Sequence, residues 1–136
     1  MTANVLIKGG RIIDPSQSVD EIADLLVTNG VITEIKTSLD KPRNSEVFDA
    51  EGKIVCPGFI DLHCHLREPG EEYKETIETG TAAAAAGGFT TVCAMPNTVP
   101  AMDNQSVVEY VLKKAKETAQ IRVLPIGCVT VGRKGK

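Results

Sequence analysis

Short apolar runs separated by turn residues fill the first 53 residues of the chain. Leu25–Thr28 and Val31–Ile35 flank the pair Asn29-Gly30. Both turn residues tolerate positive φ, so the pattern predicts a two-residue hairpin. Val5–Ile7 and Arg11–Ile13 flank a pair of glycines, which predicts either a second hairpin or a β-bulge. The segment is typical of a small antiparallel sheet that needs a partner surface to bury its apolar face.

After residue 53 the periodicity changes to alternating strands and helices. Three strands are predicted, around Phe59–His65, at Phe89–Ala94 and at Ile121–Gly127. The helix between the first two strands is predicted at Glu71–Ala86, with acidic residues in its first turn and Gly87 as its C-cap. The helix before the third strand is predicted from a cap at Asp103 or Asn104 to about Ala119. This alternation, at about 30 residues per unit, indicates right-handed crossovers and a parallel sheet. We therefore expect two parts, residues 1–53 and 54–136.

Composition and charge narrow the class of protein. The 136 residues are 42% hydrophobic and 24% charged, with a formal net charge of −3. A charge so near neutral, with no Trp, argues against nucleic acid as a partner. No apolar run is long enough for a membrane span, and no secretion signal is visible at the N-terminus, so we expect a cytoplasmic protein with no membrane partner. Cys56, Cys64, Cys93 and Cys128 are scattered and predict mostly buried thiols in a reducing compartment.

Candidate chemistry centres on the two histidines of the chain, His63 and His65. Positions i and i+2 of a strand share a face, which would place both imidazoles side by side together with Asp61. Two neutral imidazoles can supply half of the ligands of a divalent metal, and Asp61 could accept a hydrogen bond from one ring. The alternative is a pair of histidines whose rings bond to backbone carbonyls, and the spacing alone favours that alternative.

Two longer motifs change this balance. The segment Asp49–His65, which contains Pro-Gly-Phe-Ile-Asp-Leu-His-Cys-His, resembles the signature of the amidohydrolase superfamily. Its continuation to Gly70, Leu-Arg-Glu-Pro-Gly, is similar to the dihydroorotase branch. A second motif agrees: Gly-Gly-Phe-Thr-Thr-Val at 87–92, followed by Met-Pro-Asn-Thr-Val-Pro at 95–100. The resemblance covers the whole chain.

The resemblance implies an α/β fold, the N-terminal part of a metal-dependent (β/α)8 TIM barrel preceded by a small β-sandwich subdomain. Residues 1–53 would be the incomplete subdomain and 54–136 the first three βα units. The implied activity is reversible hydrolysis of the cyclic amide of dihydroorotate to N-carbamoyl-L-aspartate in pyrimidine biosynthesis, with one or two zinc ions that activate water. His63 and His65 would be metal ligands, and Arg67 with Asn97 would bind the substrate carboxylate. The resemblance leaves open whether the protein forms a homo-oligomer or associates with aspartate transcarbamoylase.

The residues support the substrate assignment on their own chemistry. Arg67 follows His65 by two positions, and its planar guanidinium can bind a carboxylate through two hydrogen bonds. Asn97 follows the next strand, and the carboxyl ends of barrel strands open onto one face. Two alternatives stay open: Arg67 could form a rim salt bridge with Glu68 or Glu71, and Asn97 could be a turn residue.

Other functions also stay open. The chain could belong to a related cyclic amidohydrolase of hydantoinase or allantoinase type, to a non-catalytic dihydroorotase-like partner, or to a fragment without function of its own. The catalytic aspartate and the later histidine ligands that the resemblance implies have no counterpart in these 136 residues. We therefore expect the isolated chain to bind zinc weakly, to show no turnover and to aggregate.

Overall fold

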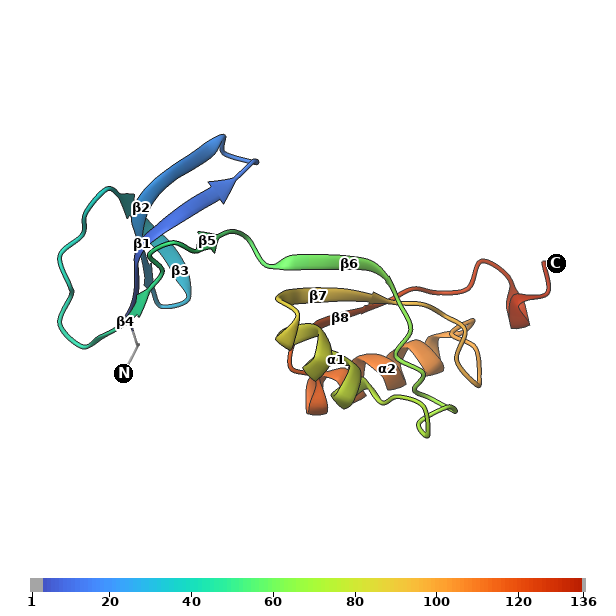
Figure 1. Cartoon of the computed structure of the whole chain (residues 1–136). Helices are drawn as coiled ribbons and strands as arrows, with labels where there is room; N and C mark the ends of the chain where they lie inside the picture. Colours follow the sequence, from blue (N-terminus) through green and yellow to red (C-terminus); the bar gives the residue numbers. More distant parts are fainter. Residues whose placement is uncertain (1–3, 136) are drawn as a thin grey trace. The chain divides into compact units, whose positions relative to one another are not determined.

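The computed structural model describes residues 4–135 and divides the chain into two compact units, Met1–Pro57 and Gly58–Lys136 (Figure 1). The first unit consists of strands and loops, and the second combines strands with helices. Within the described part of the chain, no helix is long and apolar enough to cross a membrane.

A five-stranded sheet forms the first unit, in the order β3-β2-β1-β4 with β5 also paired to β1. Its strands are β1 (Asn4–Asp14), β2 (Val19–Thr28), β3 (Val31–Lys36), β4 (Ser45–Asp49) and β5 (Ile54–Val55). The predicted hairpin is confirmed, because β2 and β3 pair antiparallel around Asn29 and Gly30, whose φ angles are 55° and 76°.

The glycine pair in β1 produces a bulge rather than a hairpin. β1 runs unbroken through both glycines, and its register with β2 shifts between Ile7 and Gly10. Gly9 takes a φ of 69°, which few residues other than glycine adopt. Of the two alternatives that the sequence left open, the bulge is therefore confirmed.

The expectation of a purely antiparallel sheet is wrong, because β4 and β5 both pair parallel to β1. Residues 37–44 carry the chain from the end of β3 to the edge where β1 begins, so β4 starts in the same direction as β1. The buried carboxylate of Asp24 holds this connection: it accepts hydrogen bonds from the backbone N–H groups of Leu39 and Gly9, both at 2.9 Å.

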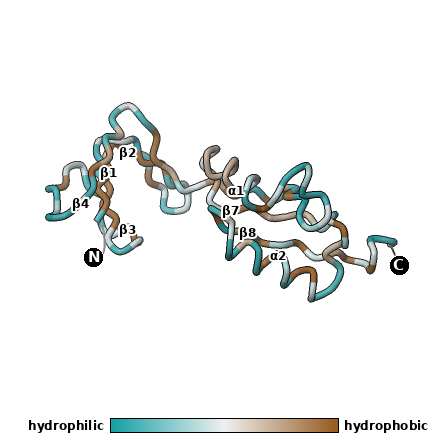
Figure 2. Tube along the Cα trace, turned by 90° about the horizontal axis from the view of Figure 1, so that it is seen from below, coloured by the Kyte–Doolittle hydropathy of each residue, from teal (hydrophilic) through white to brown (hydrophobic). Residues whose placement is uncertain are grey.

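One face of this sheet carries more apolar side chains than the unit itself covers. Figure 2 shows hydrophobic residues along β1 and β2. Ile12 and Leu25 are buried, but Ile32 on β3 is 57% exposed, and an apolar groove of about 410 Å3 lies over the face, lined in part by Ile7 and Ile35. The face therefore has room for a covering surface, as the sequence predicts.

The second unit is a three-stranded parallel sheet, in the order β6-β7-β8, with two helices on one face (Figure 1). Its elements are β6 (Phe59–Cys64), α1 (Ile77–Ala86), β7 (Phe89–Ala94), α2 (Gln105–Thr118), β8 (Arg122–Pro125) and the 3-10 helix η1 (Val131–Arg133). The predicted alternation of strands and helices and the parallel sheet are confirmed.

Helix α1 begins later than the sequence pattern indicates. It starts at Ile77 rather than at Glu71, because Thr76 caps it in a reciprocal pair of hydrogen bonds with Thr79. The residues before Thr76 form turns, in which the backbone N–H of Lys74 bonds to the carbonyl of Glu71. Its C-cap is at Gly87, as predicted. Helix α2 agrees with the prediction, and the side chain of its N-cap, Asn104, accepts from the N–H of Val107.

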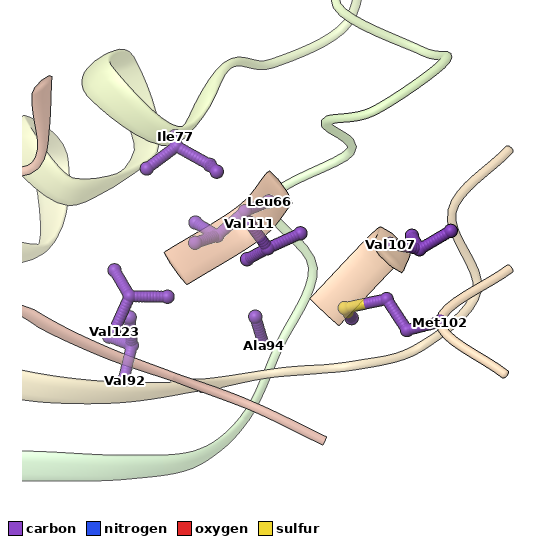
Figure 3. Packing of buried hydrophobic residues seen from close by; sticks show 8 residues of the cluster. All are labelled: Leu66, Ile77, Val92, Ala94, Met102, Val107, Val111 and Val123. Carbon is purple, nitrogen blue, oxygen red and sulfur yellow. The ribbon is translucent and has the colours of Figure 1, made fainter. Parts of the chain in front are cut away.

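The core of the second unit lies between the sheet and the two helices (Figure 3). It consists of eight buried side chains: Leu66, Ile77, Val92, Ala94, Met102, Val107, Val111 and Val123. Leu66 is the member that comes from the loop after β6, so this loop is fixed to the core directly beyond the histidines.

The cysteines are less buried than the sequence suggests. All four are free thiols; Cys56 is exposed, and Cys64, Cys93 and Cys128 are half-buried. The prediction of mostly buried thiols is therefore wrong. Cys64 lies on β6, which is an edge strand of the three-stranded sheet among the described residues.

Candidate active site

The candidate residues gather at the carboxyl ends of β6 and β7. His63 is the second-last residue of β6, and His65 follows that strand by one residue. Asn97 follows β7 by three residues. The two strand ends are held together by the backbone N–H of Met95, which donates to the carbonyl of Cys64 at 2.8 Å. Parallel pairing thus places loops that are 32 residues apart in the sequence side by side.

The two imidazoles lie next to each other. Their ring centroids are 5.2 Å apart, the ring planes meet at 66°, and both side chains are exposed. Among residues 4–135, no backbone carbonyl bonds to either ring, so the alternative of two histidines satisfied by the backbone does not describe this pair. Two exposed neighbouring imidazoles are a suitable beginning of a metal site.

Asn97 contacts His65 directly. The side-chain oxygen Oδ1 of Asn97 lies 2.8 Å from Nδ1 of His65. An amide oxygen can only accept, so in this arrangement Nδ1 carries the proton and the lone pair of Nε2 stays free. A metal-binding histidine usually has its second nitrogen tied to an oxygen in this way. The sequence pointed to Asn97 as a substrate residue and gave no signal of this contact, which depends on the pairing of β6 with β7.

The expected role of Asp61 is wrong. Its Oδ1 accepts from the backbone N–H of His63 at 2.9 Å, not from an imidazole. The β6–β7 register is also irregular between Asp61 and Cys64, and Asp61 lies opposite Val92, a core residue. The strict alternation that would put Asp61 beside both histidines is therefore interrupted, because a shift in the ladder changes which face each side chain takes.

Arg67 pairs with Glu71, one of the two salt bridges that the sequence left open. Its Nη1 lies 3.6 Å from Oε2 of Glu71, which also pairs with Lys74. The hydrogen bond from Lys74 and the positive charges of Lys74 and Arg67 lower the pKa of Glu71, so this carboxylate is ionised at neutral pH. In the described part of the chain no other carboxylate pairs with the Arg67 guanidinium, which is free to bind further oxygen atoms.

The described residues supply only part of a metal site. Among residues 4–135, no group of three or more His, Cys, Asp or Glu side chains gathers closely enough to hold a metal ion. Zinc in proteins is usually bound by three or four protein ligands. The imidazole pair fits two of these positions, with Nε2 of His65 free to bind.

Comparison with known proteins shows the family and the fold type of the chain. The family model described as "Dihydro-orotase-like" matches residues 52–136, which include the first motif from Gly52 onward, the whole second motif and all four candidate residues. The chain belongs to the dihydroorotase-like family. The family resemblance that the sequence motifs indicate is thereby confirmed.

Individual members of the family are similar over nearly the whole chain. The dihydroorotase of Geobacter sulfurreducens is 57% identical over 132 residues, and that of Geobacter metallireducens is 53% identical over 133 residues. These alignments cover 97% and 98% of this chain but 31% of each relative. The chain therefore spans about a third of the length of these relatives.

Solved structures share the fold. L-hydantoinase (dihydropyrimidinase) from Arthrobacter aurescens matches with a TM-score of 0.82 and 27% identity, covering 93% of this chain and 28% of its own. D-hydantoinase (dihydropyrimidinase) from Thermus sp. matches with a TM-score of 0.77 and 34% identity, covering 92% and 27%. The expected mixed α/β fold, shared with hydantoinases of the amidohydrolase type, is confirmed.

Proposed function

We propose that this chain forms the N-terminal portion of a zinc-dependent dihydroorotase with a (β/α)8 barrel. In this proposal residues 1–53 belong to a β-sandwich subdomain and 54–136 are the first three βα units. The observation that carries it is the imidazole pair with Asn97 bonded to His65, at the carboxyl ends of neighbouring parallel strands, with Arg67 in the loop directly after the first of these strands. Active sites of barrel enzymes lie on this face.

Each residue has a distinct task in the proposal. His63 and His65 hold zinc, which when bound lowers the pKa of water and polarises a carbonyl group. Arg67 binds the carboxylate of dihydroorotate through its guanidinium and so fixes the orientation of the ring amide. The proton transfers to the ring nitrogen need an acid–base group outside the described residues.

Asn97 can serve both the metal ligand and the substrate. Its Oδ1 is engaged by His65, which leaves the two N–H groups of Nδ2 as donors. These donors suit a carboxylate held at the same time by Arg67. Binding from two directions would select substrates that carry this carboxylate over cyclic amides that lack it.

Steady-state kinetics of the intact protein that carries this chain test the proposal. Arg67→Met should raise the KM for dihydroorotate by about tenfold or more, because a charge-assisted pair with the carboxylate is lost. Arg122→Met is the matched control: Arg122 is exposed at the amino end of β8 and should leave the KM unchanged. An unchanged KM in Arg67→Met would remove the substrate assignment.

A hydantoinase-like activity is the second candidate, favoured by the structural similarity to hydantoinases. Hydantoin and dihydrouracil lack the carboxylate that Arg67 would bind. Turnover of these compounds at a rate that Arg67→Met does not change, without turnover of dihydroorotate, would support this candidate. Stoichiometric zinc without turnover of any cyclic amide would instead indicate a non-catalytic partner.

A further inference from the structure

Arg67 has an unusual backbone conformation. Its φ is 61°, and the N–H of Glu68 donates to the carbonyl of Leu66 at 2.7 Å, which closes a tight three-residue turn around Arg67. A side chain with a Cβ is strained in this region, and such turns are rare outside glycine. Strained residues persist where the surrounding structure holds them in place.

The residue after Arg67 is a buried acid with several partners. The side chain of Glu68 is 4% exposed. Its Oε2 accepts from the backbone N–H of Ile77 at 2.9 Å, and its Oε1 accepts from the hydroxyl of Tyr110 at 3.2 Å and lies 3.6 Å from Nζ of Lys114. Burial and the negative charge of Glu68 raise the pKa of Tyr110, so its hydroxyl stays protonated and donates.

These contacts reach both helices of the second unit. Ile77 is the first residue of α1, and Tyr110 and Lys114 lie on one face of α2. On the other side of Arg67, Leu66 is 4% exposed and packs in the core. Arg67 is therefore the half-buried residue between two buried anchors, one apolar and one ionic.

Capping of α1 does not by itself explain why the side chain of Glu68 is buried. Thr76 and Thr79 already form a reciprocal cap at the start of this helix. Removing a carboxylate from water costs free energy unless several groups bind it. One additional hydrogen bond to a helix that is already capped does not offset this cost. The position of Glu68, directly beside the strained residue, suggests a different task.

We propose that Glu68 is a positioning residue: together with Leu66 it clamps Arg67 in the strained turn and so fixes the direction in which the guanidinium leaves the loop that follows the two histidines. The clamp is a property of the fold, and its effect on substrate binding rests on the proposed function. If the carboxylate is weakened, the turn relaxes and Arg67 loses its fixed direction, whereas zinc binding by the histidines is retained.

A denaturation cycle on the intact protein tests the clamp without any substrate. In the wild-type background, Arg67→Gly should unfold at a higher denaturant concentration than Arg67→Ala, because glycine takes a φ of 61° without strain. In the Glu68→Gln background, the difference between the two midpoints should fall by about half or more, because the turn is no longer enforced. An undiminished difference would overturn the proposal.

A kinetic cycle tests the consequence for the site. Glu68→Gln should raise the KM for dihydroorotate about fivefold or more, with kcat changed less. The KM of the double variant Glu68→Gln/Arg67→Met should be no higher than that of Arg67→Met alone, because both changes act on the same guanidinium. Thr76→Ala is the matched control: it removes the cap of α1 but leaves the Glu68 contacts, and its KM should stay near that of the wild type.

The outcomes separate the two proposals. If Thr76→Ala raises the KM as much as Glu68→Gln, or if the effects of Glu68→Gln and Arg67→Met multiply, Glu68 has only a general structural role. If the protein turns over no dihydroorotate, the proposed function fails, and the denaturation cycle still decides on the clamp. If Glu68→Gln does not fold, Tyr110→Phe, which removes a single hydroxyl, takes its place in both cycles. A smaller change in the midpoint difference and in the KM, in the same direction, would support the clamp. No change in either quantity would contradict it.

Discussion

The contact between Asn97 and His65 predicts which nitrogen of an imidazole carries the proton. With the oxygen of Asn97 2.8 Å from Nδ1, His65 should favour the Nδ1–H tautomer, and Asn97→Ala should remove this preference. One neutral hydrogen bond is worth about 0.5–1.5 kcal/mol net. With RT near 0.6 kcal/mol, the ratio of the two tautomers should therefore shift about 2- to 12-fold toward Nε2–H.

Long-range 1H–15N spectra of the metal-free intact protein with labelled histidine measure this ratio at alkaline pH, where the rings are neutral. The signals of His63 and His65 are assigned with His63→Gln and His65→Gln. His63 is the internal control, because the structure places no Asn97 contact on its ring. Asn97→Asp is the matched variant: it keeps an acceptor at the same place and should keep the Nδ1–H tautomer.

The result also bears on the metal. Loss of an oxygen partner behind a ligating histidine typically lowers metal affinity about 10- to 100-fold, so zinc should bind more weakly to Asn97→Ala than to Asn97→Asp. A wild-type His65 in the Nε2–H form, or a ratio that Asn97→Ala leaves unchanged, would refute the reasoning. Either result would mean that Asn97 presents its amide nitrogen to the ring or does not contact it.

Two further predictions concern a buried acid in the first unit and the thiol between the two histidines. Backbone hydrogen bonds, above all from Leu39, lower the pKa of the buried Asp24, so this carboxylate should stabilise the first unit above about pH 4 and lose its effect as the pH falls through its lowered pKa. Asp24→Ala should lower the free energy of unfolding by about 1–3 kcal/mol at pH 7, measured by urea titration followed by circular dichroism. The free energy of unfolding of the variant should also fall less than that of the wild type as the pH is lowered. An equal fall in both proteins would contradict this prediction. Burial, and then the charges of Asp61 and Glu75, raise the pKa of the Cys64 thiol. Iodoacetamide at pH 7.5 should therefore label the exposed Cys56 faster than Cys64, which a mass-spectrometric time course measures. Equal labelling rates would contradict this prediction.

Local patterns predict most of the second unit because each of its elements has a local cause. The helix capped by Asn104 and the strand Phe89–Ala94 are where the sequence places them, since caps and apolar periodicity act over a few residues. The motif around His63 and His65 also identifies the family, because it is read residue by residue. The later start of α1 at Ile77 already depends on more than its own periodicity, since the Glu68 carboxylate takes part at its first N–H group.

What only the tertiary structure decides is which distant groups meet. The parallel pairing of β4 with β1 follows from the path of residues 37–44 across the sheet, which local pattern does not contain. The pairing of β6 with β7 brings Asn97 to His65, although the two residues are 32 positions apart in the sequence. The sequence by itself predicted the family, the candidate residues and most elements of the second unit, because these depend on neighbours along the chain. The pairing of the strands and the partners of the candidate residues depend on register and burial, which arise only when the strands and helices pack.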